Sequence, residues 1–377
     1  MKTLIRLMIG IVLSALLVLS SAAQDDLQDQ TLLITFIPNI QFSPMYVAIG
    51  GGYFEEVGLN VTVDYLDEPT VVDLVAANEN QFGVVSGEQV ILAASQGRPI
   101  VYVYEWFQQY PIGVVYSADM EVTSFADFAD LRVGIPGRFG ANYSGLTTFL
   151  DTADMSETDI SVQEIGFNAP EVFCVGAVDA AVIYVNNEPL QIRNRAQQGD
   201  CGAVADVNVL QISDVVDLVS NGIITNQQTI DENPELVQAM VSAYNNALEL
   251  IIANPARAYL LSAPFIEGLP LDDDLRVELE TLADEQDMFL ESDPDMDSLY
   301  ASHQAMYETL SSQFDADTLI QFEVLLASIP LWNAERLGFS DLASWENMQA
   351  TLVALGQLDE PIALETIFTN DFLPASD

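Results

Sequence analysis

The stretch Pro38-Asn39-Ile40-Gln41-Phe42-Ser43-Pro44-Met45-Tyr46-Val47-Ala48 decides the fold of this chain, because a predicted strand ends there and a helix begins. The preceding residues 32–37 are apolar and partly β-branched, as is typical of a buried strand. Ser43-Pro44 suits a helix cap and first helical position. In an open α/β sheet, ligands bind at the carboxyl ends of the strands. We therefore expect this turn to bind a ligand through Asn39, Gln41, Phe42 and Tyr46.

Short apolar runs alternate with helical patterns from Leu32 to Val219, which predicts βα units and a mostly parallel sheet. Strands are expected at 32–37, 61–65, 82–85, 100–104, 113–116, 132–135, 161–164, 180–183 and near 215–219. Helices are expected at 234–253, 255–261, 271–289, 297–314, 317–327 and 342–355. The chain thus begins as α/β and ends as α.

A weak internal repeat divides the α/β part into two lobes. Residues 74–89 give helix, turn and strand before Ser86-Gly87-Glu88-Gln89, and residues 173–189 repeat that order before Asn186-Asn187-Glu188. If the lobes face each other, these two polar clusters face each other across a cleft. We expect lobe one at 27–116, lobe two at 117–221 and a return to lobe one at 222–377, with crossings near 115–119 and 221–225.

The first residues are typical of a secretory signal peptide, with Lys2 and Arg6 before an apolar run at 7–19 and a small-residue cleavage site. We expect residues 1–23 to be removed and the mature chain to be exported to the periplasm or the extracellular space. The region of the cleavage site has no cysteine that could carry a lipid anchor. No later stretch is long and apolar enough to predict a membrane span.

The composition is strongly acidic, with 57 Asp and Glu against 10 Lys and Arg. Without residues 1–23 the chain keeps 8 arginines and no lysine, a net charge near -49. Such a surface repels nucleic acid and anionic lipid, so neither is an expected partner. Because 50% of the residues are apolar, we expect a globular protein, with the acids on a solvated surface. We also expect the protein to be a monomer.

Cys174 and Cys201 are the two cysteines of the chain. In an oxidising compartment they are expected to form a disulfide, two free buried thiols being the alternative. His303 is the one histidine, and it lies in an acidic helical stretch where a structural position is expected. No nucleophile elbow, P-loop or metal-ligand motif is present, so no catalytic residue, metal or cofactor is predicted.

Aromatic and amide side chains follow several predicted strands, although each ring taken alone suits ordinary packing. Planar rings stack on flat heterocycles, and amides and carboxylates bind ring nitrogens, carbonyls and hydroxyls. The further expected ligand-binding residues are Ser86, Glu88, Gln89, Trp106, Gln108, Tyr110, Asn142, Tyr143, Tyr184, Asn187 and Glu188. Trp106 and Tyr143 are the strongest stacking candidates. Arg138 is the one cation near these groups, and so few positive charges disfavour an anionic ligand. The predicted helix start at 140–144 could still hold a small anion.

Several landmarks of the chain resemble the solute-binding proteins that bind thiamine-type pyrimidines. They are the opening turn with Gly52-Tyr53-Phe54, Gly97-Arg98-Pro99-Ile100-Val101, Gly176-Ala177-Val178-Asp179-Ala180-Ala181, Asn187-Glu188-Pro189 and Thr369-Asn370-Asp371-Phe372-Leu373. The resemblance implies a type II periplasmic-binding-protein fold, in which two α/β lobes close on a ligand, with a helical C-terminal part on lobe one. It also implies docking on an ABC permease in the membrane.

Within that family, Gln41-Phe42, the Ser86 to Gln89 sequence and Trp106-Phe107-Gln108-Gln109-Tyr110-Pro111 resemble the riboflavin-binding branch. The resemblance implies riboflavin or a similar neutral heteroaromatic vitamin, with a thiamine-precursor aminopyrimidine as the alternative. The related pyrimidine synthases use a histidine where Phe42 stands and a cysteine-rich segment where residues 191–202 contain only Cys201. An enzyme is therefore disfavoured, and a sensor domain without transport remains a further alternative.

Overall fold

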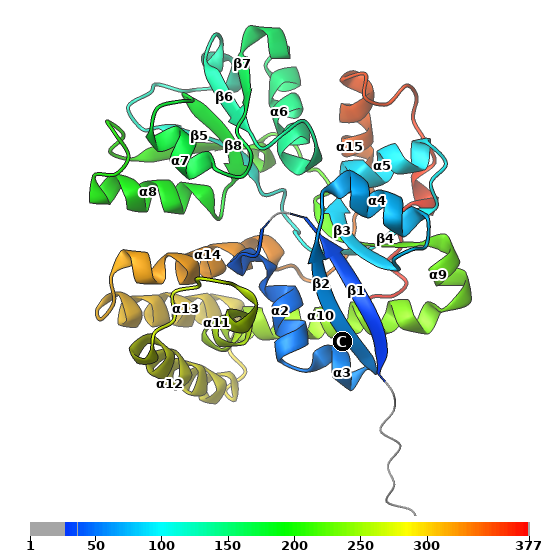
Figure 1. Ribbon diagram of the computed structural model, residues 1–377, viewed down its shortest axis with the longest axis vertical. Helices are drawn as coiled ribbons and strands as arrows, with labels where there is room; N and C mark the ends of the chain where they lie inside the picture. The colour runs from blue at the N-terminus through cyan, green and yellow to red at the C-terminus, as the bar shows by residue number, and fades with distance from the viewer. Residues whose placement is uncertain (1–26, 36, 376–377) are drawn as a thin grey trace, which may run out of the picture.

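Two five-stranded sheets organise the protein in the computed structural model, which describes residues 27–375 except residue 36 (Figure 1). The expected signal peptide, residues 1–23, lies outside the described residues. The strands are β1 (Gln28–Ile34), β2 (Leu59–Tyr65), β3 (Phe82–Ser86), β4 (Ile100–Glu105), β5 (Ile112–Ser117), β6 (Arg132–Ile135), β7 (Ser161–Glu164), β8 (Ala180–Tyr184), β9 (Val207–Gln211) and β10 (Asn221–Asn226). The first sheet has the order β2-β1-β3-β10-β4 and the second β7-β6-β8-β5-β9.

The two sheets have the same arrangement, which confirms the internal repeat. In each sheet one strand, β10 or β5, runs antiparallel to both of its neighbours, while the other observed pairs are parallel. β3 and β8 occupy the same place in their sheets, and a helix follows each of them. Glu88 and Glu188 lie in the first turns of those two helices. The repeat therefore places two glutamates at equivalent strand ends.

The helices cover the sheets and extend the first lobe. They are α2 (Ser43–Gly50), α3 (Tyr53–Glu56), α4 (Glu68–Ala76), α5 (Gly87–Ser95), α6 (Gly140–Thr152), α7 (Ala169–Cys174), α8 (Glu188–Gln198), α9 (Gln227–Glu232), α10 (Pro234–Ala253), α11 (Pro255–Ser262), α12 (Asp273–Leu290), α13 (Met296–Ser311), α14 (Ala316–Trp332) and α15 (Leu342–Ala354). Figure 1 shows α6, α7 and α8 around the second sheet and the C-terminal helices beside the first. The expected helical C-terminal half is confirmed.

The crossings between the lobes differ from the predicted positions. β5 pairs with β8 and β9, so the boundary expected at residue 116 falls inside a strand of the second lobe. The first crossing therefore lies between β4 and β5. In the described structure, residues 215–219 do not form the expected strand. They lie in the chain between strands β9 and β10. The apolar side chains of Leu218 and Val219 are buried in the second crossing, where they pack into the core without pairing.

The opening turn has the predicted order of strand, turn and helix, but the cap of α2 is Phe42, and Ser43, the predicted cap, is the first residue of the helix. β1 ends at Ile34, before the expected end at residue 37, and Ile37 is 51% exposed. Asn39 caps a short 3-10 helix, Ile40–Phe42, by accepting a hydrogen bond from the Gln41 amide at 3.0 Å. The cap satisfies a backbone donor that helix geometry leaves free. Asn39 therefore supports the turn, and Ile40–Phe42 leads directly into α2.

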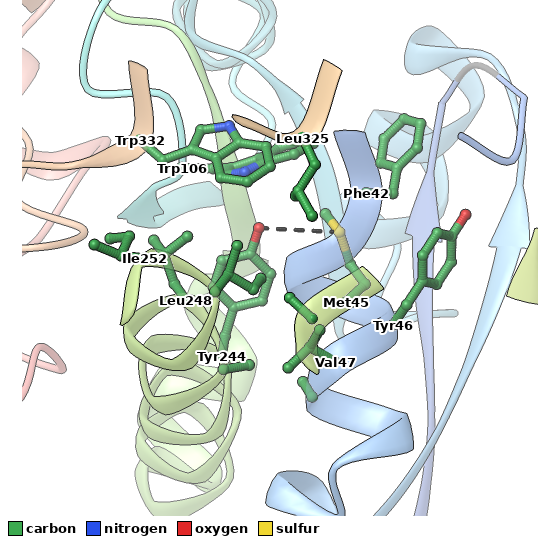
Figure 2. Packing of buried hydrophobic residues seen from close by; sticks show 14 of the residues in the cluster. Phe42, Met45, Tyr46, Val47, Trp106, Tyr244, Leu248, Ile252, Leu325 and Trp332 are labelled. Carbon is green, nitrogen blue, oxygen red and sulfur yellow. Dashed lines mark hydrogen bonds between the residues drawn. The ribbon is translucent and has the colours of Figure 1, made fainter. Parts of the chain in front are cut away.

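Helix α10 holds the first lobe together. Figure 2 shows its Tyr244 facing Met45 of α2, and the Tyr244 hydroxyl lies 3.9 Å from the Met45 sulfur. By length and composition α10 could cross a membrane, contrary to the prediction, but most of it is buried inside the protein. Its apolar character is that of a core helix.

Cys174 and Cys201 form the expected disulfide, with their Cα atoms 4.1 Å apart. It joins the end of α7 to the loop after α8, and both cysteines belong to a small apolar cluster on the second sheet. The bond therefore closes a loop within lobe two.

Replacing both cysteines, Cys174→Ser with Cys201→Ser, should lower the free energy of unfolding by about 2–4 kcal/mol, because the unfolded chain regains loop entropy. Urea denaturation of the oxidised protein and of the variant measures the difference. Reduced wild-type protein is the matched control and should unfold at the urea concentration of the variant. Equal midpoints for all three would contradict the prediction.

Candidate ligand cleft

A cleft lies between the two lobes, where strands of both sheets end. The empty space among its lining residues is about 830 Å³, a figure that includes open solvent. Lobe one contributes the opening turn, the start of α4 and the segment after β4. Lobe two contributes the start of α6, the loop after β7 and the start of α8. The expected position at strand ends is thus where the structure has a cleft.

Aromatic rings form much of the cleft wall. They are Phe42, Trp106, Phe107, Phe139, Phe167 and Tyr184. The Trp106 ring centroid lies 5.5 Å from that of Phe42 and 4.7 Å from that of Phe107. Phe107 in turn packs edge-on against Tyr184 of the other lobe at 5.9 Å. Aromatic contacts at these separations stabilise a wall that runs across both lobes.

Three amide side chains, Gln41, Asn142 and Asn221, line the same space. The Asn142 amide donates to the Val182 carbonyl at 3.1 Å, and the Tyr184 hydroxyl donates to Asn221 Oδ1 at 2.9 Å. The second bond joins β8 of lobe two to β10 of the first sheet. Asn221 and Tyr184 therefore bridge the lobes at the cleft.

Two buried donors at the cleft have no hydrogen-bond partner among the residues that the structure describes. Gln41 Nε2 and Trp106 Nε1 are both unpaired, and their residues are 6% and 3% exposed. An unpaired buried donor costs about 1–3 kcal/mol. A ligand that supplies acceptor atoms would remove that cost, so both groups are suited to bind carbonyl oxygens or ring nitrogens.

Carboxyl groups from both lobes converge on the cleft. Glu68 and Glu188 line it, and Glu88 lies behind Glu68, joined to it through Ser86. The Ser86 hydroxyl is 2.8 Å from Glu68 Oε2 and also contacts Glu88 Oε1. Burial, and then the charges of Glu68, Glu88 and Glu188, raise the pKa of the Tyr184 hydroxyl.

Burial raises the pKa values of these acids. Burial, and then the charge of Glu88, raises the pKa of Glu68 to about 8. Burial likewise raises the pKa of Glu88, and it raises that of Glu188 to about 7. One serine hydroxyl has a single proton to donate to two carboxyls, so Glu68 and Glu88 are best satisfied when one of them is protonated.

Six of the predicted site residues line the cleft. They are Gln41, Phe42, Trp106, Asn142, Tyr184 and Glu188. Ser86 and Glu88 stand one layer behind, as supports of Glu68. The structure therefore brings together residues from the opening turn, the segment after β4 and both helix starts of lobe two.

The other predicted residues do not line the cleft in the described structure. Their side chains contact other groups of the protein instead. Tyr143, expected to stack on a ligand, donates a hydrogen bond to Glu157 Oε1 at 2.7 Å, because its place in α6 directs it toward that acid. Tyr46 stacks on Phe265 and bonds to Tyr65.

Four more predicted residues have similar local roles. Tyr110 donates to the Ala141 carbonyl at 3.0 Å, and Gln108 donates to the Glu105 carbonyl at 2.9 Å. Gln89 Nε2 lies 3.3 Å from Glu88 Oε1, and Asn187 Oδ1 accepts from Gln191. These side chains hold the loops that carry the cleft. Arg138 forms ion pairs with exposed acids and is likewise outside the described lining.

The prediction missed Glu68, Phe167 and Asn221, and it left Phe139 out of the expected site. A signal for Glu68 was present, since Glu68-Pro69 repeats the Glu188-Pro189 pair and opens a helix after a strand in the same way. Phe167 follows β7, the counterpart of β2 in the repeat. Asn221 was assigned to a crossing, whereas it begins β10.

The lobes also touch outside the cleft, where α8 contacts α14. Asn186 donates to Ser328 Oγ at 2.6 Å, and Asn194 donates to Asp317 Oδ1 at 2.6 Å. Gln198 donates to the same aspartate oxygen at 2.5 Å. The described conformation is therefore one in which the lobes are in contact.

Two α/β lobes with a cleft between strand ends define the periplasmic-binding-protein fold, type II. The alkanesulfonate-binding protein SsuA from Xanthomonas axonopodis pv. citri bound to MOPS has the same fold, with a TM-score of 0.59 and 13% identity over 90% of this chain and 98% of that one. The chain belongs to the family described as NMT1/THI5 like, whose model matches residues 39–258.

Named relatives in the family include binding proteins. The chain is 32% identical over 360 residues to the riboflavin-binding protein RibY of Chloroflexus aurantiacus, covering 93% of this chain and 88% of the relative. It is 26% identical over 258 residues to the formylaminopyrimidine-binding protein of Halalkalibacterium halodurans, covering 68% and 76%. More distant relatives are named as pyrimidine phosphate synthases. The fold and these relatives support a solute-binding role.

Glu68→Gln should make the protein's stability less dependent on pH. The pKa of Glu68 is raised from 4.5 to about 8, so the folded state binds a proton that the unfolded chain releases. Its contribution is complete below pH 4.5 and is lost as the pH rises through about 8. Relative to the wild type, the variant should gain on the order of 2 kcal/mol between pH 5 and pH 8.5.

Urea denaturation at the two pH values measures this gain. Glu79→Gln is the matched control, because Glu79 is exposed, and it should follow the wild type. If Glu68→Gln also follows the wild type, Glu68 does not hold the proton.

Proposed function

We propose that this protein is the extracytoplasmic solute-binding component of an ABC importer, and that it captures riboflavin or a similar neutral heteroaromatic vitamin. The observation that carries the proposal is the cleft itself. It combines aromatic rings from both lobes with two unpaired buried donors, and its described lining contains no lysine or arginine. A flat, uncharged ring system with carbonyl and ring-nitrogen acceptors has the complementary chemistry.

The rings are placed to cover both faces of such a ligand. Phe42 and Trp106 belong to lobe one, and Phe139 and Phe167 belong to lobe two. Closure of the lobes would stack a three-ring isoalloxazine between them, and groups of both lobes would be satisfied only around the right ligand. The similarity to a relative named riboflavin-binding protein supports this choice.

A thiamine-precursor aminopyrimidine is the second candidate. Glu68 and Glu188 suit the N–H donors of an amino group, and a relative is named formylaminopyrimidine-binding protein. One small ring would cover less of the aromatic wall than an isoalloxazine does, so the larger ligand is favoured.

Three residues support a binding protein over a synthase. Phe42 stands where the resemblance places a catalytic histidine. Cys201, in the segment expected to be cysteine-rich in an enzyme, is paired with Cys174. The one histidine, His303, is buried in α13, and burial lowers its pKa to about 4. We propose that it is a core residue with no role in catalysis.

Export and delivery to a membrane permease complete the proposal. The predicted signal peptide and the disulfide favour an oxidising compartment outside the cytoplasm. A monomer that opens and closes about the two crossings would suffice for capture. A sensor that binds the same ligand without transport would share this cleft, and growth on limiting riboflavin after gene deletion would distinguish the two.

Titration of the mature protein with riboflavin should quench flavin fluorescence and give a Kd in the micromolar range or below. Trp106→Phe, which keeps a ring but removes the indole N–H, should weaken binding about tenfold, because a ligand acceptor loses its donor. Isothermal titration calorimetry checks the same change.

Tyr143→Phe is the control, because Tyr143 has its partner outside the cleft, and it should bind as the wild type does. Tight binding of an aminopyrimidine with none of riboflavin would overturn the proposed ligand. Equal affinity of Trp106→Phe and wild type would remove the indole from the site.

A further inference from the structure

The ionisable groups of the cleft are acids, contributed by both lobes. Glu68 opens α4 in lobe one, and Glu188 opens α8 in lobe two. Among the described lining residues there is no lysine, arginine or histidine. Arg138, the cation nearest in sequence to the start of α6, is engaged by Glu157 and Glu164. A ligand in this cleft therefore meets carboxyl groups and no compensating positive side chain.

Two unpaired donors belong to residues of the same lining. Trp106 Nε1 can only donate, and Gln41 Nε2 lies on the same lining, with both residues more than nine-tenths buried. These donors are uncharged. They match the neutral acceptors of a heterocycle and provide no counter-charge for an anion.

The acid on lobe one is fixed in place and closely covered. Ser86 holds Glu68 on one side. On the other side stands Gly140, the first residue of α6, where a Cβ atom would lie only 2.9 Å from Glu68 Oε2. Lobe two thus approaches Glu68 as far as a glycine allows, and little room remains for water to screen a charge. An anionic group brought into this space would be desolvated beside fixed carboxyls.

We propose, on the basis of the proposed function, that Glu68 and Glu188 make the cleft select the unphosphorylated form of its ligand. A free hydroxyl or ring N–H can donate to a carboxyl oxygen. A phosphate ester instead carries about -1.5 to -2 charges at neutral pH and only acceptor oxygens. It would be buried beside two acids without a cation. The site is therefore specific for a free vitamin and rejects the corresponding phosphorylated coenzyme.

The test compares riboflavin with riboflavin 5′-phosphate, using flavin fluorescence quenching by the mature full-length protein at pH 9, where both cleft acids are ionised because the pKa of Glu68 is about 8 and that of Glu188 about 7. The wild type should bind riboflavin at least about 100-fold more tightly than its phosphate, because like charges in a desolvated site are strongly disfavoured. Glu68→Gln and Glu188→Gln should each reduce that ratio at least about fivefold. The ratio is measured on one preparation, so a partly unfolded variant does not distort it.

Glu55→Gln is the matched control, because it removes the same charge from an exposed position on α3 and should leave the ratio unchanged. Two outcomes overturn the inference: a wild-type ratio below about 10, or an unchanged ratio in both cleft variants. Failure of the wild type to bind either flavin would instead overturn the proposed function. The two failures are therefore distinguishable.

Discussion

Aromatic packing around Trp106 is the interaction on which the rest of this structure depends. Its ring lies 5.5 Å from Phe42 at the end of the opening turn and 6.0 Å from Trp332 at the end of α14. Through Phe107 the same cluster reaches Tyr184 of lobe two. Figure 2 shows Trp106 and Trp332 above the contact of α2 with α10. One cluster thus joins the cleft wall, the first crossing and the C-terminal helices, so the ligand site shares its support with the lobe interface.

The excess of acid has different consequences on the surface and in the cleft. Many surface carboxylates are solvated, and several, such as Asp272, Asp295 and Asp315, cap helices by accepting backbone hydrogen bonds. In the cleft, Glu68 is buried and Glu188 half-buried, and the pKa values of both are raised. The surface acids keep the protein hydrated, whereas the cleft acids determine which ligand charge the site tolerates.

Periodicity and repeats sufficed to predict the architecture. Helix α10, β6 and β7 have the predicted bounds, and six more of the predicted strands are present with shifted ends, because short apolar runs and helix-starting prolines are local signals. The crossing positions were wrong because pairing partners are not local: β5 is assigned to lobe two by its neighbours β8 and β9. The edge strand β9 was missed, since its half-buried pattern is weak.

Part of the cleft lining could likewise be predicted from local signals. Gln41, Trp106 and Glu188 could be predicted because they follow strands. The cleft lies where strands of both sheets end. Tyr143 could not be excluded from sequence, since its direction depends on the distant acid Glu157. Glu68 depends on the approach of Gly140 from the other lobe, which no local pattern encodes.

A crystal structure of the complex with riboflavin is the most direct test of the central claim. The account predicts the isoalloxazine between the lobes, against Phe42 and Trp106, with its acceptor atoms within hydrogen-bond distance of Gln41 Nε2 and Trp106 Nε1. It also predicts that no phosphate-sized anion lies beside Glu68 or Glu188. A flavin bound outside this cleft, or one bound there with both donors still unpaired, would contradict it.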